Sequence, residues 1–411
     1  MRPRVVIVGA GFGGLRAARA LRAAPVDVVL IDRRNYHLFQ PLLYQVATAG
    51  LEPEQIARPV RAILRGQAHL TFRMAEVQGF DRQARVVQTQ AGPIAYDFLI
   101  LACGSVTNFL GLPGVAQDGY GLKDLDDAVG IRNHILRRFE EAAAESGPER
   151  RRQLLALVVA GGGPTGVEMA GALAELRRVL LDRDYPALDP DEVRVSLLEA
   201  SERLLPTMPD RLAAAAAERL TQKGVEVRLG AAVDEYSRGV IRLRSGEQIP
   251  AATLIWAAGA RASSLAAGLG TSLGPQGRVP VQPTLQLPGS PEVYVIGDAA
   301  YLETGGRGLP MMAPVAIQMA EAAAANILRQ IGGRDPVDFL YRDPGSLATI
   351  GRNAAVAFIH GFSFTGFPAW VVWLVVHLIQ LIGFRNRLFV LINWAWDYFL
   401  YDRAVRLITP D

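Results

Sequence analysis

The chain has 411 residues, a formal net charge of +3 and a hydrophobic content of 50%. One hydrophobic core rarely organises a chain of this length, so two or three domains are expected. The apolar content excludes a disordered or fibrous chain, because such a chain cannot bury enough apolar surface to offset the entropy of ordering. The 43 basic and 40 acidic residues nearly balance and form no long basic run, which argues against a nucleic-acid partner.

Cysteine and histidine content excludes two further kinds of site. Cys103 is the one cysteine of the sequence, so the chain forms no intramolecular disulfide, whether structural or catalytic. We interpret this residue as a small core side chain. The five histidines lie far apart in the sequence and form no cluster with metal-ligand spacing, so no metal site is predicted.

The first 32 residues have the pattern of a βαβ unit. A wholly apolar strand is predicted over residues 5–8, a helix rich in Ala, Leu and Arg over 15–23, and a second apolar strand over 28–31. The basic start and the apolar stretch also fit a signal peptide, but closely spaced glycines interrupt that stretch. We therefore expect this N-terminus to be cytosolic.

Gly9, Gly11 and Gly14 form a Gly-x-Gly-x-x-Gly turn between the first strand and the helix. In a dinucleotide-binding unit the first glycine permits the tight turn, the second lets the backbone approach a pyrophosphate, and the third lets helix and strand pack closely. The helix N-terminus then offers free N–H groups to the phosphates. Asp32 ends the second strand, where its carboxylate can accept hydrogen bonds from an adenosine ribose. We expect a dinucleotide here.

The same order of elements returns about 150 residues later. A strand is predicted over residues 154–160, a helix over 167–181 and a second strand over 193–199, with a glycine turn after the first strand. Two copies of one nucleotide-binding unit indicate an internal duplication of architecture. Two sites imply two dinucleotides, and hydride passes directly from a nicotinamide to a flavin, so a nicotinamide cofactor facing a flavin is the economical interpretation.

The second turn contains Gly161, Gly163 and Gly166, and Glu199 ends the strand that follows. A carboxylate at this place favours a free ribose 2′-hydroxyl and repels a 2′-phosphate, so NADH is expected over NADPH. Arg203 lies nearby in the sequence and would weaken that preference if it faced the ribose. The alternative for Glu199 is an ordinary exposed acid at a strand end.

Three further strands and one helix are predicted over residues 96–105, 249–260, 291–300 and 313–331. Within the third of these strands, Asp298 follows Gly297 at the strand end. A carboxylate there can hold hydroxyl groups of the ribityl chain of a flavin. A Gly-Asp pair alone is a common turn, but together with the N-terminal glycine pattern it indicates a flavin.

The last 50 residues change character. Residues 367–384 are almost continuously apolar, interrupted by His377 and Gln380, and the basic run 385–387 follows. Four of the five tryptophans fall in this region, namely Trp370, Trp373, Trp394 and Trp396. The stretch is shorter than the roughly 20 apolar residues of a spanning helix, and tryptophan and arginine favour the headgroup region. We predict helices that lie in one leaflet; a dimer interface and a true span stay open as alternatives.

Five runs of this sequence carry a family resemblance. The most specific are DRRNYHLFQPLLYQVATAG at 32–50 and the tail LIGFRNRLFVLINWAWDY. The others are GGGPTGVEMAGALAE, YVIGDAA and APVAIQMA. Together they resemble type II NADH dehydrogenases, the single-subunit NADH:quinone oxidoreductases that pump no protons, and the resemblance covers essentially the whole chain.

This resemblance implies an α/β fold with two Rossmann-like dinucleotide-binding domains, as in the two-dinucleotide-binding-domain flavoproteins, and a C-terminal amphipathic membrane-docking helical region. Non-covalent FAD is expected in the first domain and NADH, as substrate, in the second. The expected boundaries are 1–115 and 256–340 for the two parts of the FAD-binding domain, 116–255 for the NADH-binding domain and 341–411 for the membrane-anchoring region.

The implied function is hydride transfer from NADH to FAD, followed by transfer of two electrons to a membrane quinone, ubiquinone or menaquinone, without proton pumping. A homodimer on the cytoplasmic face of the cell membrane, docked on the bilayer surface, is expected. The alternative enzyme is a soluble NADH-dependent flavoprotein reductase of a protein acceptor such as a ferredoxin, against which the apolar tail argues. A flavoprotein that senses NADH without catalysis is a third hypothesis.

Carried over by position, the resemblance implies two catalytic residues, Glu168 near the nicotinamide and flavin rings and Gln318 at the quinone site. The residues assigned to FAD are Gly9, Gly11, Gly14, Asp32, Arg33, Gly297 and Asp298, and those assigned to NADH are Gly161, Gly163, Gly166 and Glu199. The plainer alternatives are an acid stabilised by the dipole in the first turn of its helix and a solvated helix glutamine. The chain departs from many members at Pro314, where they have glutamine, so a quinone contact from that position is not carried over.

Overall fold

The computed structural model describes residues 2–400 and 405–409. The chain forms two compact units, each assembled from segments that are distant in the sequence. Unit 1 comprises the segment up to Leu38, Ala57–Val106 and Ala260–Asp343. Unit 2 comprises Phe39–Ile56, Thr107–Gly259 and the chain from Pro344 onwards. Residues 401–404 and 410–411 of the predicted membrane-anchoring region lie outside the described residues.

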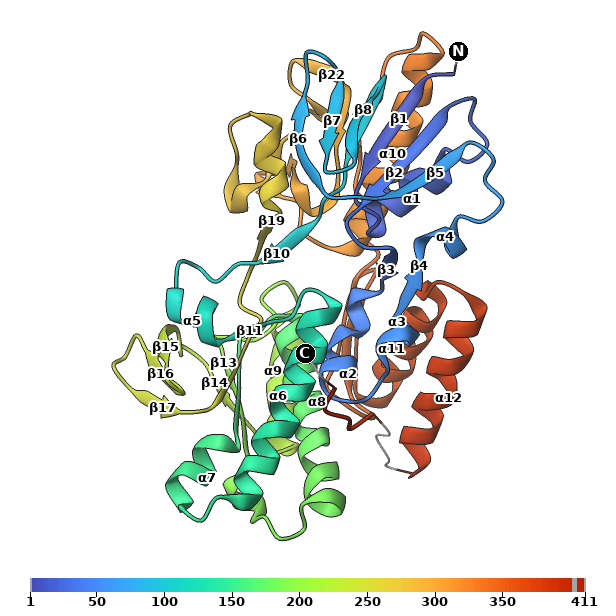
Figure 1. The fold of residues 1–411 in the computed structure, drawn as a ribbon. Coiled ribbons are helices and arrows are strands. Elements are labelled where there is room, and N and C mark those ends of the chain that lie inside the picture. The colour runs from blue at the N-terminus through green and yellow to red at the C-terminus, as the bar shows by residue number, and fades with distance from the viewer. Residues whose placement is uncertain (1, 401–404, 410–411) are drawn as a thin grey trace. The chain divides into compact units, whose positions relative to one another are not determined.

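A six-stranded sheet forms the centre of unit 1 (Figure 1). Its strand order is β21 (Gln286–Leu287), β22 (Ser290–Val295), β9 (Phe98–Leu101), β1 (Arg4–Val8), β2 (Asp27–Asp32) and β5 (Leu70–Met74). All neighbouring strands are parallel except β21 and β22. Val5, Val6 and Ile7 of β1 are fully buried. These β-branched residues suit a strand that is covered on both faces.

Helices α1 (Phe12–Ala20) and α10 (Ala313–Ile331) pack against each other in unit 1, and α1 also contacts β1 and β2. Pro314 lies in the first turn of α10, where a missing N–H leaves no bond unmade. The smaller elements are β3 (Tyr36–Leu38), β4 (Ala57–Pro59), α4 (Val60–Ile63), β6 (Val77–Asp81), β7 (Val86–Thr89), β8 (Gly92–Ala95), β10 (Ser105–Thr107), β19 (Ala260–Ala262), β20 (Val279–Pro280), β23 (Ala300–Tyr301), β24 (Glu303–Thr304) and β25 (Arg307–Gly308). The carboxyl ends of the parallel strands meet at one sheet edge, so the turns after β1, β2 and β22 share that edge.

Unit 2 is built on a second parallel sheet. Its strand order is β11 (Tyr120–Gly121), β18 (Thr253–Trp256), β12 (Ala156–Ala160), β13 (Arg194–Leu198) and β14 (Val225–Arg228). The helices are α2 (Leu43–Ala47), α3 (Pro53–Ile56), α5 (Pro113–Asp118), α6 (Leu125–Ala144), α7 (Pro148–Leu154), α8 (Pro164–Val179) and α9 (Asp210–Gln222). Helix α6 begins at a capping box in which Asp124 and Asp127 each accept a hydrogen bond from the other's backbone N–H. An antiparallel sheet of β15 (Val233–Ser237), β16 (Val240–Leu243) and β17 (Gln248–Pro250) shares a buried core with β12 and β18.

The C-terminal part of unit 2 consists of a small sheet and two helices. The antiparallel strands are β26 (Ser346–Thr349), β27 (Ala355–Ile359) and β28 (Phe362–Thr365), and the helices are α11 (Gly366–Gln380) and α12 (Phe384–Leu400). Helix α11 packs on all three strands, β26 contacts α8, and α12 contacts α11 and α3. The C-terminal part is thereby attached to helix α8 of its own unit.

Three predicted strands are shorter or divided in the structure. Of residues 96–105 the strand β9 covers only Phe98–Leu101, and in 291–300 the strand β22 ends at Val295 before a 3₁₀ turn. At residues 249–260 one long strand was expected. The chain there forms β17, β18 and β19 instead. Pro250 cannot donate to a strand ladder, so β17 ends at it. The next two backbone N–H groups bond outside the β16–β17 ladder. Ala251 donates to the carbonyl oxygen of Gly239, and Ala252 donates to that of Gln153. The predicted helix over 313–331 has the observed bounds of α10.

The apolar tail forms helices of 15 and 17 residues, α11 and α12. Among the helices that the structure describes, none has both the length and the apolar run needed to cross a membrane.

Candidate active site

The first glycine turn leaves space at one glycine and none at the other two. A side chain on Gly9 would strike the carbonyl oxygen of Ala102, and its φ of +103° also favours glycine. A side chain on Gly14 would strike the carbonyl oxygen of Gly9. In contrast, a Cβ on Gly11 would meet nothing within 4 Å. Gly9 and Gly14 are therefore required by the packing of the chain itself, and the open face at Gly11 fits a pyrophosphate.

Asp32 is fixed beside this turn. Its Oδ2 accepts a hydrogen bond from the backbone N–H of Ala10 (2.6 Å), and its Oδ1 accepts one from the N–H of Arg34 (2.8 Å). Burial raises the pKa of the Asp32 carboxyl, and the two N–H donors oppose that shift. The side chain of Arg33 is exposed next to it. The carboxylate is thus held at the sheet edge where a ribose of a dinucleotide would lie.

His37 was not among the predicted site residues, yet it also lies at this turn. Its Nδ1 is 3.0 Å from the carbonyl oxygen of Ala10, and its ring packs edge-on against Phe12. Burial lowers the pKa of His37, so the ring is neutral at physiological pH. Its buried Nε2 has no hydrogen-bond partner within the described part of the chain. A buried polar atom left open beside a glycine turn fits a site that a bound dinucleotide completes.

Asp298 lies at the same edge of the sheet, after β22. Gly297 has a φ of +65°, and this places Asp298 in a single 3₁₀ turn (Gly297–Ala299). The hydroxyl of Ser105 donates to Oδ2 of Asp298 (2.5 Å). Cys103 lies nearby on the chain that leaves β9, and desolvation raises the pKa of its thiol to about 12. The thiol therefore stays protonated, as expected for a structural cysteine.

The second glycine turn, in unit 2, repeats this arrangement. A side chain on Gly161 would clash with the backbone of Ala257, and one on Gly166 with the carbonyl oxygen of Gly161. A Cβ on Gly163 would meet nothing within 4 Å. The open backbone again lies at the N-terminus of a helix, α8, where free N–H groups stabilise a phosphate.

Glu199 occupies the position in unit 2 that Asp32 has in unit 1. Its Oε2 accepts a hydrogen bond from the N–H of Gly162, and its Oε1 accepts one from the N–H of Ser201 (2.7 Å). Arg203 pairs with Asp210 and donates to backbone carbonyls, so its guanidinium is already engaged. Arg203 is thus not directed at a 2′-phosphate beside Glu199, which fits NADH.

Glu168 is buried in α8 and is bound by the C-terminal part of unit 2. Its Oε1 accepts hydrogen bonds from the backbone N–H of Thr349 (3.3 Å) and from Nε1 of Trp373 (3.1 Å). Burial raises the pKa of Glu168 to about 8, although both donors lower it. The expectation of a first-turn acid was wrong: α8 begins at Pro164, and its first turn contains no acidic residue.

Gln318 lies on α10 in unit 1. Its Nε2 donates to the carbonyl oxygen of Arg342 (2.8 Å), and its Oε1 accepts from the N–H of Arg342 (3.0 Å). Both ends of the amide are thus bonded to one backbone position, just before the chain enters unit 2 at Pro344. The solvated-glutamine alternative does not account for this pairing.

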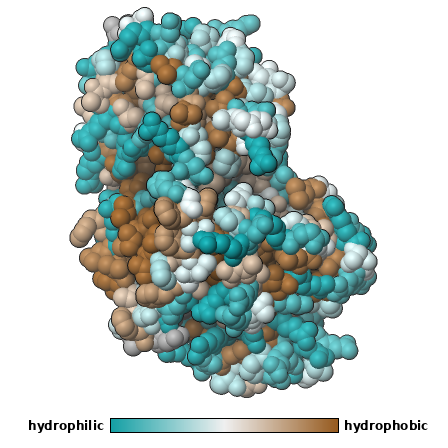
Figure 2. Space-filling model, turned by 180° about the vertical axis from the view of Figure 1, so that it is seen from behind, coloured by the Kyte–Doolittle hydropathy of each residue, from teal (hydrophilic) through white to brown (hydrophobic). Residues whose placement is uncertain are grey.

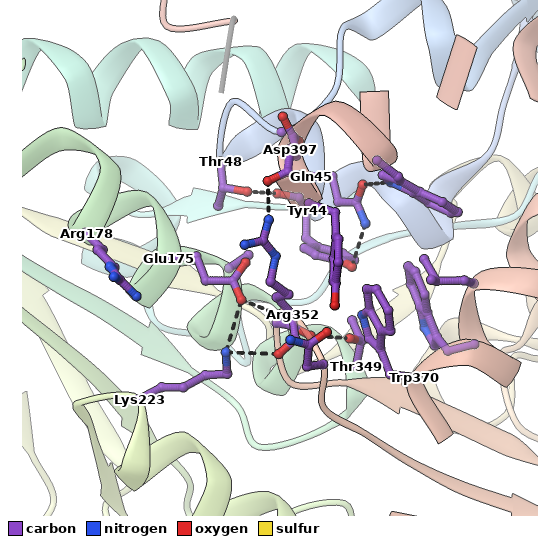
Figure 3. Close-up of a pocket in the computed structure, with 18 of the residues that line it drawn as sticks. Tyr44, Gln45, Thr48, Glu175, Arg178, Lys223, Thr349, Arg352, Trp370 and Asp397 are labelled. Atoms are coloured by element: carbon purple, nitrogen blue, oxygen red, sulfur yellow. Dashed lines mark hydrogen bonds and ion pairs between the residues drawn. The ribbon is translucent and has the colours of Figure 1, made fainter. Parts of the chain in front are cut away.

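A cavity of about 290 Å³ opens in unit 2 next to the donors of Glu168 (Figure 3). Its charged wall includes Glu175, Lys223 and Arg352, in which Lys223 Nζ lies 3.1 Å from Glu175 Oε1. Its aromatic wall consists of Tyr44, Trp370, Trp373, Trp394 and Tyr398. Thr349 and Trp373 line this cavity, whereas Glu168 does not.

The predicted site residues fall into two groups. Unit 1 holds Gly9, Gly11, Gly14, Asp32, Arg33, Gly297, Asp298 and Gln318, and unit 2 holds Gly161, Gly163, Gly166, Glu168 and Glu199. Each glycine turn has its carboxylate beside it, as predicted. Sequence patterns did not individually indicate His37, Thr349 and Trp373 as site residues. The last two contact Glu168 across 181 and 205 residues, a separation that local patterns do not reveal.

Comparison with known proteins agrees with this geometry. Residues 3–320 match the family of pyridine nucleotide-disulphide oxidoreductases, and residues 344–403 match the NDH2 C-terminal domain. A type II NADH:quinone oxidoreductase of Mycobacterium tuberculosis is 41% identical over 99% of this chain and 90% of its own length. One of Staphylococcus haemolyticus is 30% identical over 89% of this chain and 92% of its own.

Solved structures share the fold. NDH2 from Plasmodium falciparum in complex with NADH covers 100% of both chains with a TM-score of 0.90 at 20% identity. The sulfide:quinone oxidoreductase of Aquifex aeolicus covers 97% of this chain and 96% of its own with a TM-score of 0.76 at 19% identity. The fold class is thus the two-dinucleotide-binding-domain flavoprotein type that the sequence predicted. The chain belongs to the type II NADH:quinone oxidoreductases, enzymes that use FAD and NADH.

Proposed function

We propose that FAD binds at the glycine turn of unit 1 and NADH at the glycine turn of unit 2 of this NADH:quinone oxidoreductase. The observation that carries this assignment is the repeated arrangement of an open central glycine and a carboxylate bonded to the turn. When bound, FAD supplies the chemistry that accepts a hydride from NADH and delivers two electrons to the quinone. The protein's own residues bind and orient the two nucleotides.

The proposed roles of the binding residues follow from their contacts. Gly9, Gly11, Gly14, Asp32, Arg33, Gly297 and Asp298 hold FAD, and Gly161, Gly163, Gly166 and Glu199 hold NADH. The corresponding domain boundaries are 1–115 and 256–340 for FAD, 116–255 for NADH and 341–411 for the membrane-anchoring region. Asp32 and Glu199 bind ribose hydroxyls through carboxylates whose orientation the turns fix.

We assign proton handling to Glu168 and quinone-site organisation to Gln318. With a pKa of about 8, the Glu168 carboxyl carries a proton at neutral pH, and reduction of a quinone consumes two. Gln318 fixes the chain at Arg342 through both ends of its amide.

The exposed surface of the C-terminal helices supports docking on a bilayer. Large apolar side chains are exposed along both, namely Phe367, Val371, Val375, Ile379, Phe384, Leu388, Phe389, Leu391, Ile392, Trp396 and Phe399. Figure 2 shows a hydrophobic area at the left, where these helices lie. Arg385 and Arg387 lie at the start of α12, where they would face anionic headgroups. A quinone stays in the bilayer, so the enzyme has to work at its surface.

The family resemblance supports two further proposals. The enzyme acts as a homodimer, and it acts on the cytoplasmic face of the cell membrane, where NADH is available. Sedimentation of the detergent-solubilised protein tests the first, and protease access in sealed inside-out and right-side-out vesicles tests the second.

The assignment as a whole is tested by anaerobic NADH oxidation with the solubilised, FAD-containing protein. We expect NADH oxidation to require a soluble quinone analogue as the acceptor. With ferredoxin as the acceptor instead, we expect little reduced ferredoxin to form. Failure to discharge the reduced protein to any benzoquinone or naphthoquinone would overturn it. Turnover with ferredoxin alone would favour the soluble reductase instead.

Membrane docking is tested by flotation with vesicles of anionic phospholipid. Leu388→Glu combined with Ile392→Glu places two charges on the exposed face of α12 and should release most of the protein from the vesicles. Leu340→Glu, at an equally apolar exposed position of unit 1, is the matched control and should still float. Equal flotation of both variants would show that α12 is not part of the docking surface.

Gln318→Ala tests the quinone-site assignment. Stopped-flow kinetics should show reoxidation by quinone slowed about tenfold, with reduction by NADH nearly unchanged. Gln330→Ala, which also removes a hydrogen-bonded glutamine from α10, should change neither half-reaction. Equal loss in both half-reactions of Gln318→Ala would make this residue structural.

A further inference from the structure

The Glu168 carboxyl receives both of its hydrogen bonds from the C-terminal part of the chain. One donor is the backbone N–H of Thr349 at the end of β26, and the other is the indole N–H of Trp373 on α11. Within the described residues no other hydrogen bond reaches this carboxyl. A residue of the nucleotide-binding helix α8 is therefore held by the segment that carries the apolar docking surface.

Trp373 is held in a fixed position from several sides. The residue is 1% exposed, and its ring stacks on His377 with centroids 4.1 Å apart and planes 24° apart. Tyr44 and Trp394 pack against the same ring at 6.5 and 5.8 Å. Side chains packed this closely seldom change rotamer, so the indole N–H stays directed at Glu168.

The ionisable groups around Glu168 leave the two N–H donors as its direct polar contacts. On its own helix, Glu175 is paired with Lys223, the residue that directly follows α9. On α11, His377 lies behind the Trp373 ring, and burial lowers its pKa to about 4, so it is neutral. On α2, the phenol ring of Tyr44 packs against the Trp373 ring. The flanking elements carry Arg194 on β13, Glu226 and Arg228 on β14, and Asp182, Arg183 and Asp184 after α8, while β12 and β26 carry no ionisable side chain.

We propose that Trp373 is a positioning residue for Glu168, so that the place of α11 sets the orientation and the charge of a carboxyl on the NADH-binding helix. The indole donates to the ionised carboxylate and stabilises it; removing the donor favours the protonated form. A shift of α11 away from α8 has the same effect as removing the indole. The proposal rests on the role assigned to Glu168 above and names what controls that residue.

The test follows the carboxyl directly rather than through turnover. Infrared titration of the FAD-containing protein, with Glu168→Gln used to identify the band of the protonated acid, gives the midpoint of Glu168. Trp373→Phe keeps an aromatic ring and removes the N–H, and should move that midpoint upward by about one pH unit. An unchanged midpoint would overturn the proposal.

Trp394→Phe is the matched control. This tryptophan lies on α12, lines the same cavity and donates its indole N–H to Gln45 Oε1 (2.8 Å). Its replacement removes the same groups from the same aromatic cluster without touching Glu168, so the midpoint should stay in place. An equal shift in both variants would mean that loosening of the cluster, not the donor, sets the charge.

A second measurement needs no tryptophan substitution. In protein labelled with ¹⁵N at its five indole groups, one indole signal should move with pH at the midpoint of the carboxyl, and Glu168→Gln should abolish that movement. Absence of any titrating indole in the unmodified protein would overturn the proposal even if Trp373→Phe failed to fold.

The positioning role of Trp373 and the catalytic role of Glu168 can be overturned separately. If Glu168→Gln leaves both half-reactions unchanged while Trp373→Phe still moves the midpoint, the positioning role stands and the catalytic role of Glu168 falls. If Glu168→Gln slows turnover while Trp373→Phe leaves the titration midpoint of Glu168 unchanged, the catalytic role stands and the positioning role is wrong.

Discussion

The two glycine turns are nearly the same, but the helices that follow them are not. Both turns have an open central glycine, and both carboxylates accept an N–H from the turn. Two residues after the last glycine, however, α1 carries Arg16 and α8 carries Glu168. Arg16 is about half exposed and pairs with Glu321 of α10. Glu168 is buried among groups from the C-terminal part.

This difference separates what the turn does from what its helix does. We expect the turn to bind a dinucleotide in either unit, because backbone packing and the carboxylate beside it fix its geometry in the same way. In our proposal, the residue that follows decides whether the helix serves as scaffold or takes part in chemistry.

The largest effects are expected from filling the open glycines. Gly11→Val puts a side chain where the pyrophosphate of FAD would pass, so the purified protein should be colourless. Gly163→Val should leave the protein yellow and raise the KM for NADH about tenfold or more. Flavin absorbance and steady-state kinetics measure the two results. If both variants keep FAD, the assignment of the two nucleotides to the two turns is wrong.

Next in size is the pH dependence of stability at Glu168. The folded-state pKa is raised from 4.5 to about 8, so the folded state favours the protonated acid. The contribution of this group to the free energy of unfolding is complete below about pH 4.5 and is lost as the pH rises to about 8. It amounts to at most about 5 kcal/mol in total. The melting temperature of the unmodified protein should therefore decrease relative to that of Glu168→Gln as the pH rises through this range. Parallel curves would contradict the raised pKa.

A smaller effect is expected at the carboxylate of the second turn. Glu199→Ala removes an acceptor for the ribose, and kcat/KM for NADH should fall about 10- to 100-fold. The value for NADPH should fall less, because the carboxylate also repels a 2′-phosphate. Equal losses for both donors would show that Glu199 only braces the turn through Gly162 and Ser201.

The smallest effect is expected at the counterpart of Glu168. Arg16→Ala breaks an exposed ion pair, and such pairs contribute about 1 kcal/mol or less to the free energy of unfolding. FAD content and both half-reactions should be unchanged. A loss of activity as large as that of Glu168→Gln would mean that the two helices are more alike in function than their burial indicates.

The sequence predicted the parts of this fold that depend on neighbouring residues. The glycine turns, their strands, α10 and the two carboxylates all follow from local pattern and spacing. The break at Pro250 was missed because each half of residues 249–260 is apolar and reads as strand. Thr349 and Trp373 beside Glu168 could not be found, since only the folded chain brings together residues so far apart. The domain boundaries and the individual site roles stay predictions.

The protonated thiol of Cys103 has a practical consequence for labelling. Alkylating reagents attack the thiolate, and a pKa of about 12 leaves almost none of it at neutral pH. Because the sequence has no other cysteine, one introduced on α11 or α12 would become the single fast-reacting position. A spin label or fluorophore can then report the depth of these helices in a bilayer without prior removal of the native cysteine.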